Sequence, residues 1–595
     1  MKYIITMKLR YFILAGVALL GLSSCSDFLD KPSDTRVTLT NTEQLRMLMT
    51  SAYPEYSYVP FCELSTDNFI DNNCPGVDGV RFNLASYDRN DDEAFAFEDI
   101  RTSTGEDTPS GSWEGYYLAI ATCNAVLEKV AEFEAEGQNS GLLQAVKGEA
   151  LIDRAYCHFM LANIFCMPYR GPELSKQEPG IPYMLAPETT VKPHYERGTL
   201  AETYEKIEKD IEDGLPLIND AYYEQPKYHF NKQAAYTFAS RFYLFKRDYP
   251  KVIECANMVF GGPDVDPMPY MTDIWAHKDE LEDDDDFNRY YVNPAHMRNF
   301  LIIPTYSAYC RHLYQGNRYA CNREAMKATL WDGKGPTWSG VHPCYNGCGM
   351  YIAGSNQDYG LWWAPAVGEQ FEYTDKVAGI GYAHQVLCEF TGEEALFNRA
   401  EAKLFLGDVD GCVADLGVWE GAHRNTTGST SSLKAWSKEI VRDFYTTAEN
   451  KYVLNSRPER RELLGGKLLD SLYFGIAKPL HIDLVCPSDK YHNSPEINPF
   501  LQCIQHFRRI EFIFRGMRWF DIKRFGISYS HSIGKDARVV TLNPNIDAGV
   551  LDHRMALQIP NEVIAAGIDP NNRIDPPLMT RVSGFKKAIL QPSGE

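Results

Sequence analysis

The chain has 595 residues, of which 23% are charged and 13% aromatic, and its formal net charge at pH 7 is −21. This length exceeds what one compact core usually supports, so it predicts several domains or an elongated helical array. The acidic balance argues against a protein that binds nucleic acid, because a phosphate backbone needs a basic protein face.

The N-terminus has the pattern of an export signal. Basic residues precede an uncharged apolar stretch from Tyr11 to Leu22, and small residues follow it. The stretch is shorter than the ~20 residues that a transmembrane helix needs. We therefore predict a cleaved signal and not a membrane span.

Leu22-Ser23-Ser24-Cys25 resembles a bacterial lipobox, in which the peptide is cut just before the cysteine and the sulfur receives diacylglycerol. We predict a lipoprotein signal peptide over residues 1–24, lipid attachment at Cys25, and an anchor and linker over residues 25–40. Several acyl chains on one cysteine give stable membrane anchoring. The alternative is an ordinary signal in which Cys25 is incidental.

The cysteines after Cys25 are interpreted mainly as small buried hydrophobes, because many stand at apolar positions of predicted helices. An oxidising compartment permits disulfides as well. The local candidates are Cys62 with Cys74 and Cys344 with Cys348, although spacing alone cannot fix connectivity.

Apolar periodicity predicts helices over much of the first half of the chain. They cover residues 41–49, 113–135, 142–166, 199–215, 232–246 and 249–260.

Two helix pairs share a pattern in which a small residue stands eight positions before an aspartate. The pairs are Ser240 with Asp248 and Ala400 with Asp408. A small residue lets two helices approach closely, and the aspartate can cap the second helix. This spacing favours degenerate tetratricopeptide-like hairpins in a helical solenoid.

Residues 261–385 differ from the helical segments, because they are rich in Gly, Pro, Asn, Tyr and Trp and have little helical period. We predict an irregular, loop-rich region there. The acidic run at 282–286 lacks the spacing of an EF-hand loop, so we interpret it as a solvated turn. Helices are expected again at 457–474 and 504–525, and loops and short strands after 554.

No catalytic signature stands in its proper context: the sequence has no Gly-x-Ser-x-Gly, His-Glu-x-x-His or Walker motif. Paired carboxylates of a glycoside hydrolase stay open, because their separation is a spatial property. His342, Cys344 and Cys348 lack a fourth metal ligand nearby, so we predict neither a metal nor a cofactor.

Aromatic residues are concentrated between residues 331 and 363 in a Gly- and Asn-rich context. Indole rings stack on the flat faces of sugars, and exposed apolar patches usually mark interaction sites. The alternative is that the rings only pack loops onto the helices, as we expect of Trp113 and Trp519 in the core. The predicted ligand-binding residues are Trp275, Trp331, Trp338, Tyr345, Trp362 and Trp363.

Ten short motifs occur along the chain in an order typical of one family. They are Ser26-Asp27-Phe28-Leu29-Asp30, Glu63-Leu64-Ser65-Thr66-Asp67-Asn68, Trp113-x2-Tyr116-x3-Ile120-x3-Asn124, Gly148-Glu149-Ala150-x3-Arg154-Ala155, Gly180-Ile181-Pro182, Arg197-x-Thr199, Ala239-x-Arg241-x-Tyr243-Leu244, Arg399-Ala400-Glu401-Ala402, Arg508-Arg509-Ile510-Glu511-Phe512-x2-Arg515-Gly516-x-Arg518-Trp519-x-Asp521-Ile522-x-Arg524 and Gln558-Ile559-Pro560. Through these motifs the chain resembles the RagB/SusD-type outer-membrane lipoproteins of the Bacteroidetes over essentially its whole length. Arg515 departs from the family, where an acidic residue is common, and we expect altered local salt bridging there.

The resemblance implies a mainly α protein, a tetratricopeptide-like helical-hairpin solenoid with a large irregular ligand-binding subdomain. It divides the chain into a helical region over 41–260, a loop-rich ligand-binding insertion over 261–385 and a C-terminal region over 386–595. In some members the Ser-x-Asp-Asn segment lies near the ligand, which makes Asp67 and Asn68 secondary candidates.

The function implied is that of a cell-surface lipoprotein without catalytic activity. It would capture oligosaccharides and pass them, as a lid, to a SusC-like TonB-dependent transporter in the outer membrane. The alternatives are a RagB-like lid that captures oligopeptides and, from another class, a surface glycoside hydrolase or lyase.

Overall fold

The computed structural model describes residues 39–74, 83–101, 105–188, 195–277, 280–314, 317–321, 335–337, 351–353, 361–363, 366–423, 434–447, 476–487, 490–536, 538–542 and 551–573. The chain divides into a short unit, Met1–Gln44, and a main unit, Leu45–Glu595. Across the described ranges no helix has both the length and the apolar content needed to cross a membrane. The domain boundaries predicted from the sequence stay predictions.

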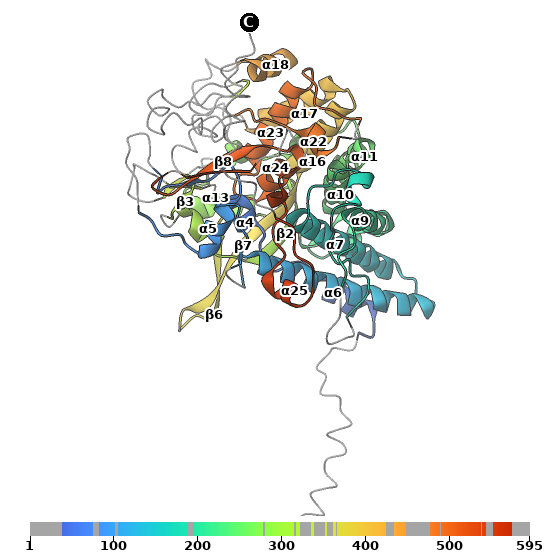
Figure 1. The fold of residues 1–595 in the computed structure, drawn as a ribbon. Coiled ribbons are helices and arrows are strands. Elements are labelled where there is room, and N and C mark those ends of the chain that lie inside the picture. Colours follow the sequence, from blue (N-terminus) through green and yellow to red (C-terminus); the bar gives the residue numbers. More distant parts are fainter. Residues whose placement is uncertain are drawn as a thin grey trace, which may run out of the picture. The chain divides into compact units, whose positions relative to one another are not determined.

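The fold is mainly helical, as predicted (Figure 1). The helices of the first half are α3 Thr42–Met49, α4 Val59–Leu64, α5 Arg89–Phe95, α6 Pro109–Ala135, α7 Gly141–Phe165, α8 Pro172–Ser175, α9 Leu200–Gly214, α10 Lys232–Lys246, α11 Tyr249–Phe260, α12 Ile274–His277 and α13 Asp284–Tyr291. Those that follow are α14 Tyr309–Tyr314, α16 Gly392–Phe405, α17 Val409–His423, α18 Lys438–Thr446, α22 Ile482–Val485, α23 Asn498–Glu511, α24 Met517–Phe525 and α25 Asn561–Ala565.

Capping residues begin several of the long helices. The Thr108 hydroxyl accepts a hydrogen bond from the Gly111 amide at the start of α6, and the Ser140 hydroxyl caps α7 in the same way. Thr199 and Glu202 form a capping box on α9. These side chains satisfy amides that have no partner inside the helix, which fixes where each helix begins.

The two predicted helix pairs are confirmed as hairpins, α10 with α11 and α16 with α17, and α11 also packs against α16. The predicted cap at Asp408 is present, since its Oδ1 accepts from the Gly411 amide at 2.8 Å. The predicted cap at Asp248 is wrong, because its side chain makes no capping bond. There the main-chain oxygen of Asp248 accepts from the Val252 amide instead.

Both hairpin turns pass through a left-handed backbone position immediately before the aspartate. In the second hairpin this position is Gly407, with φ +89°, whereas in the first it is Arg247, with φ +65°. A glycine has no Cβ to clash in this conformation, and an arginine does.

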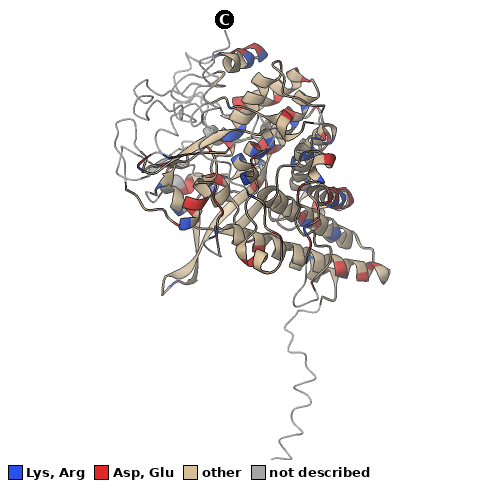
Figure 2. Ribbon diagram, in the orientation of Figure 1, with Lys and Arg blue, Asp and Glu red and all other residues tan. Residues whose placement is uncertain are grey.

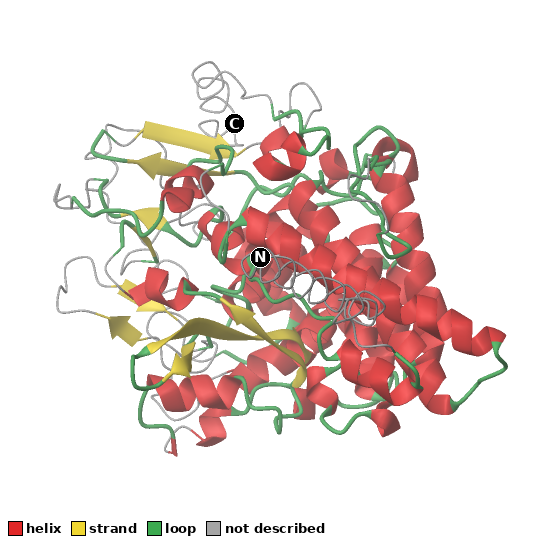
Figure 3. Cartoon of the chain, turned by 90° about the horizontal axis from the view of Figure 1, so that it is seen from below, coloured by secondary structure: helices red, strands yellow, loops and turns green. Residues whose placement is uncertain are grey.

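Strands gather on one side of the helices in the main unit (Figure 3). The largest sheet has the antiparallel order β2–β7–β6, formed by β2 Asn299–Tyr306, β7 Ile380–Thr391 and β6 Glu369–Asp375. The three strand pairs elsewhere are β1 Ile70–Asp71 with β3 Tyr319–Ala320, β4 Tyr351–Ala353 with β5 Leu361–Trp363, and β8 Tyr529–Ile533 with β9 Arg538–Leu542.

Strands β2 and β6 of the three-stranded sheet lie inside the region 261–385, where the sequence predicted no strand, and β7 begins there and extends to Thr391. The first five residues of β2 are all buried, so the strand lacks the alternation of apolar and polar residues that reveals a half-exposed strand. Beyond the end of β2, β6 and β7 continue as a two-stranded ribbon with exposed Tyr373 and Tyr382. The acidic run at 282–286 begins α13 and is no irregular turn: Asp283 caps the helix by accepting from the Asp286 amide.

The single helix predicted over 504–525 is wrong, because the chain breaks there into α23 and α24. Phe514 and Gly516 both have left-handed backbones, with φ of +64° and +74°. Glu63 holds the turn, since its two carboxylate oxygens accept from the Phe514 and Gly516 amides, each at 2.9 Å. A carboxylate more than 400 residues away in the chain gives no local signal of this break.

Asp67 is the centre of a buried ion-pair network. Its carboxylate lies 2.8 Å from Arg518 Nε, 3.0 Å from Lys478 Nζ and 3.6 Å from Arg509 Nη1, and these side chains are at most 5% exposed. Figure 2 shows the basic positions of α23 and α24 in blue. The network joins the segment after α4 to the C-terminal helices.

Further buried ion pairs stabilise contacts between other helices and strands. Arg241 of α10 pairs with Glu389 and Glu394 at 2.6 and 2.5 Å, and Arg508 pairs with Asp521 at 2.8 Å. Each cation is satisfied by more than one acceptor. Satisfied partners are the condition under which buried charge is tolerated.

The candidate disulfide between Cys62 and Cys74 is not formed, because both cysteines are free. Cys62 is buried in the core, and the Cys74 thiol donates to the carbonyl of Gly534 at 3.2 Å. Cys344 and Cys348 lie outside the described residues. Trp113 and Trp519 are 8% and 1% exposed, which confirms that they belong to the core.

Asp67→Asn is expected to destabilise the protein by about 3–5 kcal/mol, because three buried cations then lack their counter-charge. Urea unfolding followed by far-UV circular dichroism measures this change. The matched control is Asp213→Asn, which removes an exposed pair with Lys209 and is expected to leave the free energy of unfolding nearly unchanged. Equal losses in the two variants would contradict the role given to Asp67.

Glu63 is expected to make stability depend on pH. Burial raises the pKa of Glu63 from its ordinary 4.5 to about 7, although hydrogen bonds from Asn68, Phe514 and Gly516 oppose the shift. Between these two values the folded chain keeps a proton that the unfolded chain has lost. The stabilisation is therefore complete below pH 4.5 and declines as pH rises through about 7, by up to ~3 kcal/mol.

Urea unfolding of the wild type and Glu63→Gln at pH 4.5 to 7.5 tests this expectation. The glutamine carries no titrating proton, so its profile should lack the part of the decline that belongs to Glu63. Parallel profiles would contradict the assignment.

Candidate functional site

The short helix α14 stands where a half-exposed cluster of polar and aromatic side chains meets the surface. Asp107 fixes the start of the helix: its Oδ1 accepts from the Ser307 hydroxyl and its Oδ2 from the Ala308 amide, both at 2.7 Å. Burial raises the pKa of Asp107 to about 6, against the opposing charge of His312 and these two bonds. The neighbouring side chains of α14 are thereby held in place.

Tyr87 lies over the ring of His312, with the two ring centroids 3.9 Å apart. His312 itself is buried, and its Nδ1 stands 3.4 Å from a carboxylate oxygen of Asp91 in α5. Burial alone would lower the pKa of His312, but Asp91 and Asp107 outweigh it, so the pKa lies above its ordinary value. Tyr87 is 39% exposed, so this tilted ring pair reaches the solvent.

Arg311 forms a two-pronged ion pair with Glu369 of β6. Its Nε and Nη2 donate to the two carboxylate oxygens at 2.6 and 2.7 Å. The pKa of Arg311 is raised, mainly by Glu369 and to a smaller extent by Tyr87. We call Tyr87, Asp91, Arg311, His312 and Glu369 the α14 cluster.

Strand β5, which carries Trp362 and Trp363, packs beside α14, with Cα atoms of the two elements within 8 Å. In the pairing with β4, Trp363 stands opposite Tyr351 and Trp362 opposite Ile352. The structure therefore places the backbone of two predicted ligand-binding residues next to the α14 cluster. The rings of Trp362 and Trp363 lie outside what is described.

The other predicted aromatic residues are placed differently. Trp331, Trp338 and Tyr345 lie outside the described residues, as does the predicted lipidation site Cys25. Trp275 belongs to α12, whose Ile274 packs against Tyr290 and Tyr291. For all of these residues, ligand binding or lipidation stays a prediction.

Asp67 and Asn68 are 3% and 1% exposed and bind other side chains of the chain. Asn68 Oδ1 accepts from Arg509 Nε at 2.8 Å, and its Nδ2 donates to Glu63 at 2.7 Å. In this structure both residues hold the core, and their contact with a ligand stays a prediction.

Sequence reasoning missed every member of the α14 cluster. Tyr87 and Asp91 lie more than 200 residues before Arg311 and His312, and neither pair belongs to a recognisable motif. Only the fold brings them together, through α5, α14 and the edge strand β6.

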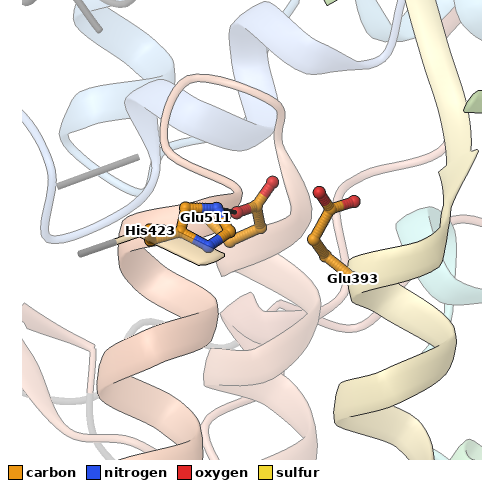
Figure 4. Close-up of side chains that lie close together, drawn as sticks. All are labelled: Glu393, His423 and Glu511. Carbon is orange, nitrogen blue, oxygen red and sulfur yellow. Dashed lines mark ion pairs between the residues drawn. The ribbon is translucent and has the colours of Figure 1, made fainter. Parts of the chain in front are cut away.

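A second group, Glu393, His423 and Glu511, converges deep in the helical part (Figure 4). Each residue offers one atom that can bind a metal ion, and these atoms lie within 4.8 Å of one another, as in a cation site. However, Arg298 donates to Glu393 at 2.8 Å and to Glu511 at 3.1 Å, and His423 lies 2.8 Å from Glu511. Arg298 thus supplies the positive charge, and the group links α16, α17 and α23 as an ion-pair cluster.

The neighbours of Glu511 stabilise its ionised form. Burial works against it, but His423, Arg298 and Arg515 together lower the pKa of Glu511 to about 2. The Arg515 guanidinium reaches Glu511 at 4.0 Å, so the residue that departs from the family pattern takes part in local salt bridging as expected.

The α14 cluster offers aromatic contact and hydrogen bonding, and both of its carboxylates are paired with basic side chains. Glu369 pairs with Arg311 and Asp91 with His312. A retaining or inverting glycosidase needs two carboxyl groups facing a substrate, one as acid and one as base or nucleophile. The geometry of the cluster therefore favours binding over bond cleavage.

Residues 27–244 match the family model SusD-like_3, described as "Starch-binding associating with outer membrane". This segment of the chain is SusD-like. It includes Asp67, Tyr87 and α3 to α9, and the match confirms the resemblance of its sequence motifs to the family. The SusD-like family is generally non-catalytic.

Solved structures support the same fold for this SusD-like chain. A SusD superfamily protein from Bacteroides thetaiotaomicron has 14% identity and a TM-score of 0.54, covering 90% of this chain and 100% of its own. SusD superfamily proteins from Bacteroides vulgatus and Bacteroides fragilis have TM-scores of 0.53 and 0.51 at 12% and 15% identity. They cover 90% and 91% of this chain, and 99% and 100% of their own. No curated protein sequence matches the chain significantly.

Proposed function

We propose that this SusD-like protein captures oligosaccharides at the cell surface and delivers them, as a lid, to a SusC-like TonB-dependent transporter in the outer membrane. Binding and release carry the function, and no bond in the ligand is broken. The description of the family model as starch-binding and outer-membrane-associated supports the ligand class and the compartment.

The α14 cluster is the observation that carries the proposal. An exposed tyrosine, the two-pronged Arg311–Glu369 pair and the tryptophan-bearing strand β5 lie together around one helix. Sugars need this combination, because their C–H faces pack on aromatic rings while their hydroxyls require paired donors and acceptors.

The transporter-lid role follows from the family resemblance together with an acylated Cys25. A lipid anchor tethers the chain to the membrane, so a captured ligand stays near the barrel.

Loss of single aromatic rings is expected to weaken oligosaccharide binding about fivefold each, since one ring contact contributes ~1 kcal/mol. The variants are Tyr87→Ala, Trp362→Ala and Trp363→Ala. Isothermal titration calorimetry measures them with a malto-oligosaccharide and with the tightest binder from a glycan array.

The matched control is Tyr373→Ala, which removes a 52% exposed tyrosine from the β6–β7 ribbon and should leave affinity unchanged. Unchanged affinity in all three site variants would refute the site. An oligopeptide screen run alongside the array distinguishes the peptide-capturing alternative, because binding of peptides and of no glycan would contradict the proposed ligand class.

Cys25→Ser is expected to move the protein from the outer-membrane fraction to the soluble fraction, because the serine hydroxyl cannot receive the diacylglycerol thioether. Labelling with radioactive palmitate, followed by fractionation, checks this result. Cys62→Ser is the control and should keep both the label and the membrane location. A membrane-bound, labelled Cys25→Ser variant would contradict lipidation at this residue.

A further inference from the structure

An open cavity of about 430 Å³ lies beside the first helical hairpin, on elements other than those of the α14 cluster. Its volume falls within the ~300–1,000 Å³ range of small-molecule sites. Arg247 at the α10–α11 turn lines it. The other lining residues that matter here are Tyr169, Glu205, Asp248, Lys490 and Tyr491.

The lining combines rings with side chains of both charges. Its cations are Lys246, Arg247 and Lys490, and its carboxylates are Glu205 and Asp248. The Lys246 ammonium is also bound to Glu208. Donors and acceptors side by side suit a neutral ligand with many hydroxyl groups, which needs both.

Arg247 is held in a conformation that a side chain disfavours. Its φ of +65° and ψ of +32° are left-handed, and Gly407 occupies the corresponding position of the α16–α17 hairpin. The two hairpins align through Ser240 with Ala400 and Asp248 with Asp408, so the chain itself shows that glycine serves this turn. Arg247 is strained at a position where glycine would not be, which indicates that its side chain has a function.

The guanidinium of Arg247 is held on one side by Ile482, since its Nη2 donates to that carbonyl oxygen at 3.5 Å. A guanidinium presents several N–H groups in one plane, which allows parallel hydrogen bonds to two neighbouring acceptors. Adjacent sugar hydroxyls present such a pair.

We propose that this cavity is a second saccharide subsite, in which Arg247 donates to neighbouring hydroxyls and Tyr169 and Tyr491 border the sugar ring. The proposal rests on the proposed function, because it assigns another part of the surface to the same class of ligand. It adds a ligand position on the helical hairpins, away from the α14 cluster.

The test is calorimetry of the full-length protein with neutral trisaccharides of the glucose, xylose, mannose and galactose series. The wild type is expected to bind two molecules of one of these probes, and Arg247→Gly only one. Tyr87→Ala should retain the Arg247-dependent molecule and weaken the other about fivefold, and the double variant should show only the weakened molecule.

Stability measurements separate loss of the guanidinium from loss of fold. Arg247→Gly removes the left-handed strain, so its urea midpoint should equal or exceed that of the wild type. Arg247→Ala should lose the same subsite with a lower midpoint than Arg247→Gly. The matched control, Gly407→Ala, introduces strain at the other turn, where a Cβ meets no atom within 4 Å, and should lower the midpoint without changing stoichiometry.

Three other binding results would overturn the subsite, each in a different way. One bound trisaccharide, weakened in Tyr87→Ala and unchanged in Arg247→Gly, refutes the subsite and leaves the proposed function standing. Trialanine binding that depends on Arg247, without saccharide binding there, refutes the ligand class. A wild type that binds no saccharide contradicts the proposed function and the subsite together.

Discussion

The carboxylate of Asp67 and the three cations around it set the geometry of the main unit. Asp67 follows α4 near the start of the unit, while Lys478, Arg509 and Arg518 come from its last quarter. Buried charges are stable only when the partners match in number and position, so this network specifies one arrangement of distant segments. Glu63, four residues earlier, acts in the same place by holding the turn between α23 and α24.

The candidate site depends on this arrangement through a short chain of contacts. The β1 strand, which follows Asp67 closely, pairs with β3, and β3 lies next to α14. Asp71 of β1 also binds Arg318, whose Nη2 lies 2.7 Å away. These contacts connect α14 and Tyr87 to the Asp67 ion-pair network. The buried network therefore helps to hold the α14 cluster in place. A ligand site of this kind needs little reorganisation on binding.

The sequence predicted the long helices well, because their evidence is local. Helix α10 was predicted at its observed bounds, and α6, α7, α9 and α11 differ by a few residues at most. The periodicity of apolar residues and the caps lie within each helix. The break between α23 and α24 was missed, because its cause, Glu63, lies far away in the chain.

The same difference between local and long-range evidence explains which residues around the candidate site could be predicted. Trp362 and Trp363 were predicted from aromatic density, which is a property of a short stretch of sequence. Tyr87, Arg311 and His312 have no such density around them and meet only after folding. The disulfide proposed for Cys62 and Cys74 failed for a related reason: spacing in the chain carries no information on whether two thiols face each other in space.

Of the twelve cysteine thiols in the described parts of the chain, ten are buried. Burial raises the pKa of thiols such as Cys255, to about 12, and thiolate is the form that reacts. The fold therefore shields these ten thiols from alkylating reagents, and each becomes modifiable only when its own element opens. Because these cysteines are distributed from α4 to α23, the rate at which each is alkylated would map local opening across the protein without any engineered label.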